Sequence, residues 1–350
     1  MKYLVCYTWN NQRGNHAGFT WMCELLQKKY PYLYKVISEY PKEKRHIVSN
    51  KFFNRCLNAI DRRYQTFAFG RAINKMMRSL KEDDEVFLMN YYYVGINQMI
   101  IADRVKKQNR NIRVLAMVHL TPSLLKETVS SQESEAWTRL IDGYLTLGSS
   151  LTNYLGNITF NRVPIYTLFH PVDDNYFKPI PKYVNKDGLN VIMFGNLQRN
   201  YSLLEEIICN VPEISFTICA GFHNCDSLKK YNNVTVLGYM PENRLREQLS
   251  MADISLNVMD DTVGSNVITI SMAMGLAMVV SDVGSIRDYC TEDNAIFCKK
   301  TGDFVEAIRY LVKHNDVLDK MKKKSLERSK LFSIERLHEQ LNLISEGRSI

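Results

Sequence analysis

Long apolar runs are missing from this 350-residue sequence. No stretch approaches the roughly 18 to 20 apolar residues that a membrane-spanning helix needs. The N-terminus has a single Lys before a short apolar segment, which is not the longer apolar core of a secretory signal peptide. We therefore expect a protein without membrane spans that stays in the cytoplasm.

Paired cysteine motifs are missing as well. The eight cysteines are scattered without a C-x-x-C pair, which favours buried free thiols. The closest pair, Cys219 and Cys225, has His223 between its members but no second pair nearby, whereas a structural zinc site needs four ligands. We expect no bound metal and no cofactor.

Charge is distributed unevenly along the chain. Residues 1–170 carry 24 Lys and Arg against 13 Asp and Glu, a net charge of +11, whereas residues 171–350 carry 21 against 24, a net charge of −3. Residues 42–81 alone hold eleven basic and two acidic side chains. Such a patch attracts phosphates, anionic lipid headgroups or nucleic acid. No nucleic-acid recognition motif accompanies it, so we expect no nucleic-acid partner.

Short apolar segments alternate with helical stretches, which is typical of βα units and a parallel sheet. The predicted strands are 2–8, 33–38, 86–90, 112–118, 143–147, 164–168, 190–195, 214–219, 233–237, 253–258, 277–281 and 294–298. The predicted helices are 16–29, 51–80, 95–108, 133–141, 149–155, 200–210, 241–251, 266–275, 284–290, 303–314 and 316–346.

The length suits two α/β domains. Residues 169–189 hold three of the nine prolines and have no periodic apolar pattern, which indicates a linker. We predict two Rossmann-like, doubly wound domains facing a cleft: an N-terminal domain at 1–170, a linker at 171–189, a second domain at 190–330, and a C-terminal helix at 331–350 that packs back on the first domain. The cleft is the expected site.

Two turns in the second half could bind a diphosphate. Gly264, Ser265, Asn266 and Val267 follow a strand and begin an apolar helix, where backbone N–H groups and the helix dipole favour an anion. The alternative is that Ser265 and Asn266 are only helix caps. The other turn follows strand 190–195, where Gly195 allows close approach and Arg199 can pair with a phosphate.

Five ordered segments across these turns resemble the donor domain of retaining GT-B glycosyltransferases of family four. They are VIMFGNL from Val191, VLGYMP from Val236, LSMADISL from Leu249, GSNVI from Gly264 and MGLAMVVSDVGSIRD from Met274. The first half is similar in its loop ending at His16-Ala-Gly18 and its strand ending before His119. The segment 171–179 is similar to the family's interdomain entry.

The resemblance implies metal-free transfer of a sugar from a nucleotide sugar, with retention, to a glycan or lipid-linked acceptor in polysaccharide or surface-glycan synthesis. The absence of an Asp-x-Asp triplet agrees with metal-free chemistry. By resemblance, donor-binding residues are Gly195, Asn196, Arg199, Gly238, Tyr239, Met240, Gly264, Ser265, Asn266, Val267 and Ser271. His119 is the catalytic candidate, lining the sugar pocket, and the acceptor-side residues are His16, Gly18 and Asn90.

Two family glutamates are replaced, because Val263 and Ser271 occupy their positions. Ser271 could bond one ribose hydroxyl, and the neighbouring Asp260 and Asp261 are possible substitutes for the missing carboxylates. The alternative function is therefore a catalytically silent GT-B protein that acts as a partner subunit or glycan-binding module. His119 also has an alternative role as a structural hydrogen-bonding residue.

The basic helix at 51–80 has two interpretations. Its cations alternate with apolar side chains, namely Phe52, Phe53, Leu57, Ile60, Tyr64, Phe67 and Phe69. Either these apolar groups pack into the first domain, or the helix docks on anionic lipid at the inner face of the membrane to reach a lipid-linked acceptor.

Overall fold

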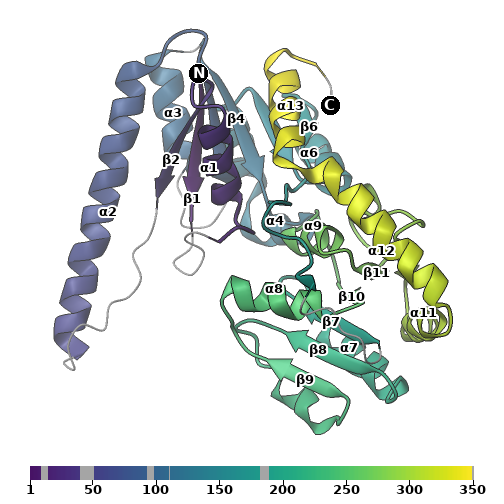
Figure 1. Cartoon of the computed structure of the whole chain (residues 1–350). Coiled ribbons are helices and arrows are strands. Elements are labelled where there is room, and N and C mark those ends of the chain that lie inside the picture. Colours follow the sequence, from purple (N-terminus) through teal and green to yellow (C-terminus); the bar gives the residue numbers. More distant parts are fainter. Residues whose placement is uncertain (9–14, 40–50, 93–97, 110, 182–188, 349–350) are drawn as a thin grey trace. The chain divides into compact units, whose positions relative to one another are not determined.

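The computed structural model describes the chain except residues 9–14, 40–50, 93–97, 110, 182–188 and 349–350. Within the helix at 51–79, the side chains of residues 51–58, 61 and 62 are also outside the description. Parts of the predicted loop at 8–18, helix at 95–108 and linker at 171–189 therefore lie outside the described residues. The chain divides into two compact units, labelled by element in Figure 1.

Unit 1 comprises residues 1–147, 151–168 and 343–350. It contains a six-stranded parallel sheet with the order β2-β1-β3-β4-β5-β6. The strands are β1 (Lys2–Tyr7), β2 (Tyr34–Glu39), β3 (Glu85–Tyr91), β4 (Arg113–Val118), β5 (Gly143–Thr146) and β6 (Ile165–Thr167). The helices are α1 (Phe19–Lys29), α2 (Lys51–Ser79), α3 (Gln98–Gln108), α4 (Pro122–Thr128), α5 (Ser131–Thr138) and α6 (Ser149–Thr159).

Unit 2 comprises residues 148–150 and 169–342. Its parallel sheet has the order β12-β11-β10-β7-β8-β9. The strands are β7 (Asn190–Phe194), β8 (Ser215–Cys219), β9 (Val234–Leu237), β10 (Ile254–Asn257), β11 (Ala277–Ser281) and β12 (Ala295–Cys298). The helices are α7 (Tyr201–Asn210), η2 (Asp226–Lys230), α8 (Glu242–Ser250), α9 (Asn266–Ala273), α10 (Ile286–Tyr289), α11 (Thr301–Lys313), α12 (Asn315–Ser329), η3 (Lys330–Phe332) and α13 (Ile334–Ser345).

The two sheets confirm the predicted α/β fold with two doubly wound halves. Each predicted strand has a counterpart, because the central strands are nearly continuous apolar runs that are buried on both faces of a parallel sheet. In unit 1, Val5 of β1 lies opposite Ile37 on one side and Leu88 on the other. In unit 2, Val191 of β7 lies opposite Phe216 and Ile254.

Two helix predictions were wrong. Helix α4 was missed; Thr121 caps it by accepting a hydrogen bond from the Leu124 amide, and Pro122 starts the first turn. The single helix predicted at 316–346 is broken by η3, and its last part begins at 334, not 331. Ser333 is extended and its hydroxyl accepts from the Arg336 amide, so it ends one helix and caps the next.

The segments between and after the sheets are anchored. In the predicted linker, Phe177 is fully buried and the Val172 amide donates to the Phe332 carbonyl at 2.8 Å. The last residues of α13 belong to unit 1, where Arg113 donates to the Ile344 carbonyl at 2.7 Å. No helix in the described part of the chain is both long and apolar enough to cross a membrane.

Candidate functional site

The sheet of unit 2 changes direction between β7 and β10. The chain runs from β7 outward through β8 to β9, and then returns to β10 on the other side of β7. Loops that leave the carboxyl ends of two such strands diverge, and ligands bind in the crevice between them. The two predicted turns, at 195–199 and 264–267, follow these two strands.

The structure brings the two turns together at Gly195. This residue has φ +79°, and a Cβ there would lie 2.7 Å from Cγ2 of Val267 and 3.4 Å from Nη2 of Arg199. Both the backbone conformation and the space require glycine. Three predicted donor-binding residues therefore meet at one point, whereas Asn196 is exposed in the same turn.

Arg199 is buried without a countercharge. Its side chain is 8% exposed, and it donates from Nη2 to the Phe194 carbonyl at 2.9 Å and from Nη1 to Oδ1 of Asn257 at 3.3 Å. Its Nε has no hydrogen-bond partner, and none of the described carboxylates forms an ion pair with it. Burial lowers the pKa of Arg199 to about 10. Such a cation is stabilised by any anion that reaches it.

A buried polar chain continues from Arg199 into the core. Asn257 donates from Nδ2 to Oγ of Ser255 at 3.0 Å, and that hydroxyl is 2.7 Å from Oγ of Ser271. All three residues are fully buried. The predicted hydrogen bond from Ser271 to a ribose hydroxyl does not fit this arrangement, because the Ser271 hydroxyl bonds to Ser255 inside the core.

The N-terminus of α9 lies beside Gly195 through Val267. Ser265 occupies the cap position, but its side chain makes no capping hydrogen bond, which disagrees with the alternative that it serves only as a cap. Gly264 precedes it with φ +96°, and a Cβ there would overlap the Tyr289 ring, 2.1 Å from its hydroxyl oxygen. Tyr289 thus fixes the turn that begins α9, and the first-turn N–H groups and helix dipole remain suited to an anion. Asn266 is half-buried at the first helical position.

No free carboxylate replaces the two glutamates of the family among the described residues nearby. Val263 is 4% exposed. Oδ1 of Asp260 accepts from Nδ2 of Asn200 at 2.7 Å, and Oδ1 of Asp261 accepts from the Thr262 amide at 2.7 Å. Asp260 therefore links the loop after β10 to the start of α7, and Asp261 stabilises its own loop.

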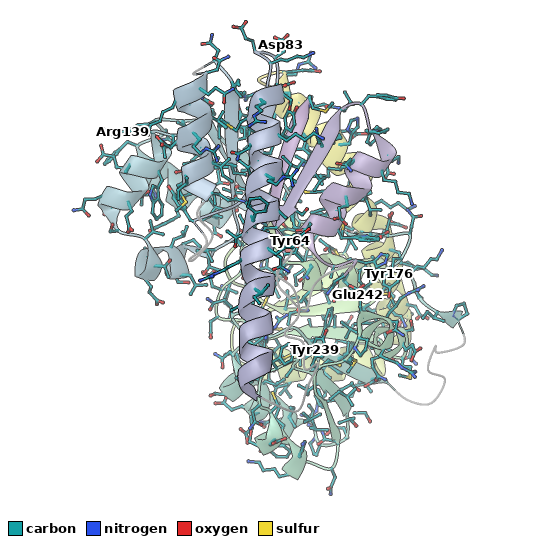
Figure 2. All side chains as sticks on the ribbon, turned by 90° about the vertical axis from the view of Figure 1, so that its left-hand side faces the viewer. Tyr64, Asp83, Arg139, Tyr176, Tyr239 and Glu242 are labelled. Atoms are coloured by element: carbon teal, nitrogen blue, oxygen red, sulfur yellow. The ribbon has the colours of Figure 1, made fainter. Side chains whose placement is uncertain are left out.

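An aromatic pair lies at the carboxyl ends of β8 and β9. Tyr239 stacks on Phe222 with ring centroids 4.5 Å apart and planes 9° apart, although both rings are more than half exposed. Figure 2 labels Tyr239. Sequence analysis missed Phe222. The available signal was that Gly221-Phe222 follows strand 214–219 just as the predicted Gly238-Tyr239-Met240 follows strand 233–237.

The remaining candidates lie in unit 1, near the carboxyl ends of β1, β3 and β4. Nε2 of His119 is 2.6 Å from the Met89 carbonyl, which can only accept, so this nitrogen carries the proton. Burial lowers the pKa of His119 to about 4, which keeps the imidazole neutral at pH 7. The edge of Phe19, the first residue of α1, packs on the His119 ring at 5.3 Å between centroids.

The predicted acceptor-side residues surround the start of α1 and the end of β3. Gly18 occupies the cap position of α1, and the ring of His16 lies 4.3 Å from that of Trp21 in the same helix. Asn90 joins β3 to β1, since its Oδ1 accepts from the Tyr7 amide at 2.8 Å. That side-chain oxygen therefore already has a structural role.

The cysteines flanking His223 do not form a ligand set with it. Cys219 and Cys225 are buried free thiols, and the His223 ring stacks on Tyr201 at 4.0 Å between centroids. Across the residues that the structure describes, no group of three or more His, Cys, Asp and Glu side chains is placed to hold a metal ion.

Residues 188–314 match the family described as glycosyl transferases group 1. HepE from Anabaena, solved in complex with UDP, has a TM-score of 0.71 at 12% identity, with 99% of this chain and 100% of that chain covered. Sucrose-phosphate synthase from Thermosynechococcus elongatus has a TM-score of 0.68 at 13% identity, with 99% of each chain covered. A glycosyltransferase from Rickettsia africae has a TM-score of 0.69 at 12% identity, with 99% of this chain and 98% of that chain covered.

No curated protein matches the sequence. The solved structures of HepE and sucrose-phosphate synthase cover 99% of the chain, which confirms the predicted GT-B architecture. The family match spans the five segments on which the resemblance was based. The chain therefore has the fold of GT-B glycosyltransferases, and its residues 188–314 match the family described as glycosyl transferases group 1.

Proposed function

We propose that the protein transfers a sugar from a nucleoside diphosphate to a glycan or lipid-linked acceptor, with retention at the anomeric carbon and without a metal, in polysaccharide or surface-glycan synthesis. The observation that carries this proposal is Arg199, a buried guanidinium with an unsatisfied Nε and no described carboxylate partner. A diphosphate beside Gly195 supplies the missing countercharge.

Negative charge develops on the diphosphate as the bond to the sugar breaks. Arg199 and the N–H groups at the start of α9 are fixed before the reaction, so they stabilise this charge without reorganising. Burial strengthens that stabilisation, because the local dielectric constant is low. These groups replace the metal ion that other enzymes use at a leaving diphosphate.

The aromatic pair Phe222 and Tyr239 suits a nucleobase. Stacking on an aromatic ring needs only a π-face and tolerates different bases. The structures of HepE contain UDP, UDP with glucose, or UDP-glucose. Uridine diphosphate is therefore the first nucleotide to test, ahead of the other diphosphates.

His119 contributes as a neutral group. Its Nε2 proton is held by the Met89 carbonyl, which orients Nδ1 as an acceptor for a sugar hydroxyl. We assign it this positioning of the sugar. His16 and Gly18 lie near the start of α1, which Phe19 connects to His119, and this favours the same part of unit 1 for the acceptor.

A second function is supported by the buried Ser271 and Val263. Neither places a carboxylate where the family has one, so a protein that binds a nucleotide sugar without turning it over is the alternative. Such a protein would act as a partner subunit or a glycan-binding module.

Turnover separates the two functions. Purified protein is incubated with a panel of nucleotide sugars, with and without prenyl-phosphate-linked glycan acceptors, and followed by NMR. We expect one donor to release its nucleoside diphosphate and give a product of retained anomeric configuration. His119→Ala should lose turnover, whereas His314→Ala, at an exposed histidine of unit 2, should keep it. Binding without turnover would support the silent alternative, and no binding of any nucleotide would contradict both.

A further inference from the structure

Among the described side chains of helix α2, those that are buried lie near its C-terminal end. Its last turns bury Ile73, Met76 and Met77 in unit 1, where these side chains are 2%, 1% and 6% exposed. Between residues 59 and 71, no described side chain is buried. Figure 1 shows the N-terminal half of α2 extending past the end of β2, and Figure 2 looks onto the helix with Tyr64 labelled midway.

The stretch between residues 59 and 71 exposes large apolar side chains. Ile60, Tyr64 and Phe67 are 63%, 63% and 62% exposed. The sequence left open whether the apolar groups of this helix pack into the first domain, and more than half of each of these three side chains is exposed. The side chains of Phe52, Phe53 and Leu57 lie outside the described residues, and Phe69 is half-buried.

The exposed groups share one face of the helix. At about 100° per residue, Ile60, Tyr64 and Phe67 lie in a stripe that Arg71, Lys75 and Arg78 continue toward the C-terminus. Ile73, Met76 and Met77 lie on the side nearly opposite. The face therefore points away from the domain that anchors the helix, and has an apolar half followed by a cationic half.

The cationic half is not neutralised within the described chain. Arg71, Lys75 and Arg78 form no ion pair with a described carboxylate. Together with Ala72 and Asn74, they line a surface hollow of about 460 Å³. The guanidinium of Arg71 also lies over the Phe67 ring, 5.9 Å from its centroid, which joins the two halves.

We propose that this face of α2 docks on an anionic lipid surface, with Ile60, Tyr64 and Phe67 in the boundary between headgroups and acyl chains and the three cations against anionic headgroups. An apolar stripe continued by cations matches the chemistry of such a surface. The inference goes beyond the proposed function, since it uses no residue of the nucleotide site. It would bring unit 1 to a lipid-linked acceptor.

A second copy of the chain fits this face of α2 less well than an anionic lipid surface does. Pairing of identical faces in parallel would set the three cations against their own counterparts. The net charge of +11 on residues 1–170 adds a general repulsion between the first halves of two copies. An anionic bilayer presents the opposite charge over its whole area.

The test is co-sedimentation of the full chain with vesicles of phosphatidylcholine alone or mixed with phosphatidylglycerol. Two α2 variants are compared with the parent chain: Ile60→Ser/Tyr64→Ser/Phe67→Ser and Arg71→Gln/Lys75→Gln/Arg78→Gln. The matched controls are Tyr32→Ser/Phe160→Ser/Leu331→Ser and Lys313→Gln/Lys320→Gln/Lys323→Gln, at exposed positions elsewhere. Circular dichroism and UDP binding establish that each variant is folded.

We expect the parent chain to bind only the vesicles that contain phosphatidylglycerol. The partition coefficient of each α2 variant onto these vesicles should be at least tenfold lower than that of the parent. The partition coefficients of the control variants should equal that of the parent. The proposal is overturned if the parent does not bind, or if both α2 variants bind as well as the parent. It is also overturned if gel filtration shows a dimer that the apolar variant converts to monomer, because the face would then serve a second copy.

Discussion

A guanidinium that is 8% exposed and has no carboxylate beside it in the described structure is costly to keep charged. The carbonyl of Phe194 and the side chain of Asn257 satisfy part of Arg199, but its Nε stays unbonded. A bound anion therefore stabilises this guanidinium more than it would stabilise an exposed one. The sequence makes Arg199 a candidate phosphate ligand, because it follows a strand and a glycine, and that role stays a prediction. It could not predict the burial, which depends on β10 lying beside β7.

Replacing Arg199 tests the role of its charge in nucleotide binding. Arg199→Met keeps an unbranched side chain but removes the cation, so we expect UDP affinity to fall by at least about tenfold, since a charge-assisted bond to phosphate is lost. Uridine, which lacks the phosphates, should bind equally to both proteins. Isothermal calorimetry measures both affinities. Arg309→Met, at an exposed arginine paired with Glu213, is the control, and equal UDP affinity of the parent and Arg199→Met would contradict the assignment.

His119 makes a prediction about stability and pH. Its pKa is lowered from 6.5 to about 4 by burial. The unfolded chain takes up this proton near pH 6.5 and the folded protein only near pH 4, so the folded state loses stability as the pH falls through that interval. When the pH is lowered from 7 to 5, the free energy of unfolding of the parent should therefore fall by about 1–2 kcal/mol more than that of His119→Gln. Urea unfolding at both pH values checks this, with His314→Gln as the control. Equal losses in His119→Gln and the parent would show that the imidazole is not buried in its neutral form.

At the scale of elements, the strands could be predicted and the ends of the helices less well. Parallel strands buried on both faces leave continuous apolar runs that are readable in the sequence. Helix α4 was missed because it has seven residues, too few for an apolar period, and depends on its Thr121 cap. The break at Ser333 was missed because the apolar period continues from α12 into α13, although a serine there can cap a new helix.

The turn before α9 depends on a glycine. Gly264→Ala would place a methyl group 2.1 Å from the Tyr289 hydroxyl oxygen at φ +96°, so we expect a loss of about 2 kcal/mol or more in the free energy of unfolding. Gly302→Ala is the matched control, because it lies in the first turns of α11 with no neighbouring atom within 4 Å of the new Cβ. That change should be neutral or stabilising by up to about 1 kcal/mol. Thermal unfolding of both variants measures these changes in stability. Equal changes in Gly264→Ala and Gly302→Ala would mean that Tyr289 does not fix the turn.

The loops after β8 and β9 make a separate prediction about the base. Phe222→Ala and Tyr239→Ala should each weaken UDP binding by about tenfold, since stacking on one ring contributes about 1–3 kcal/mol. Both variants should weaken uridine binding by a similar factor, unlike Arg199→Met. Tyr310→Ala removes another exposed stacked ring, on α11, and should leave binding unchanged. If uridine affinity is unaffected by either loop variant, the base binds elsewhere.

At the scale of the whole molecule, the chain consists of two units of similar topology. The sequence indicated this through two series of strands and through the charge difference between the halves. It could not predict that Ser271 bonds to Ser255 inside the core, or that Ile60, Tyr64 and Phe67 of α2 are mostly exposed. Both depend on contacts between segments distant in the sequence, which periodicity along one helix does not reveal.

The central claim is that a nucleoside diphosphate binds in unit 2 between the turns after β7 and β10. A crystal structure of the protein soaked with UDP tests this most directly. We predict phosphate oxygens within about 3.2 Å of the Arg199 guanidinium and of backbone nitrogens at 265–267. The base should lie against Phe222 or Tyr239. A diphosphate bound away from both turns, or none bound when the crystals are saturated with UDP and then with each other nucleoside diphosphate, would contradict the account.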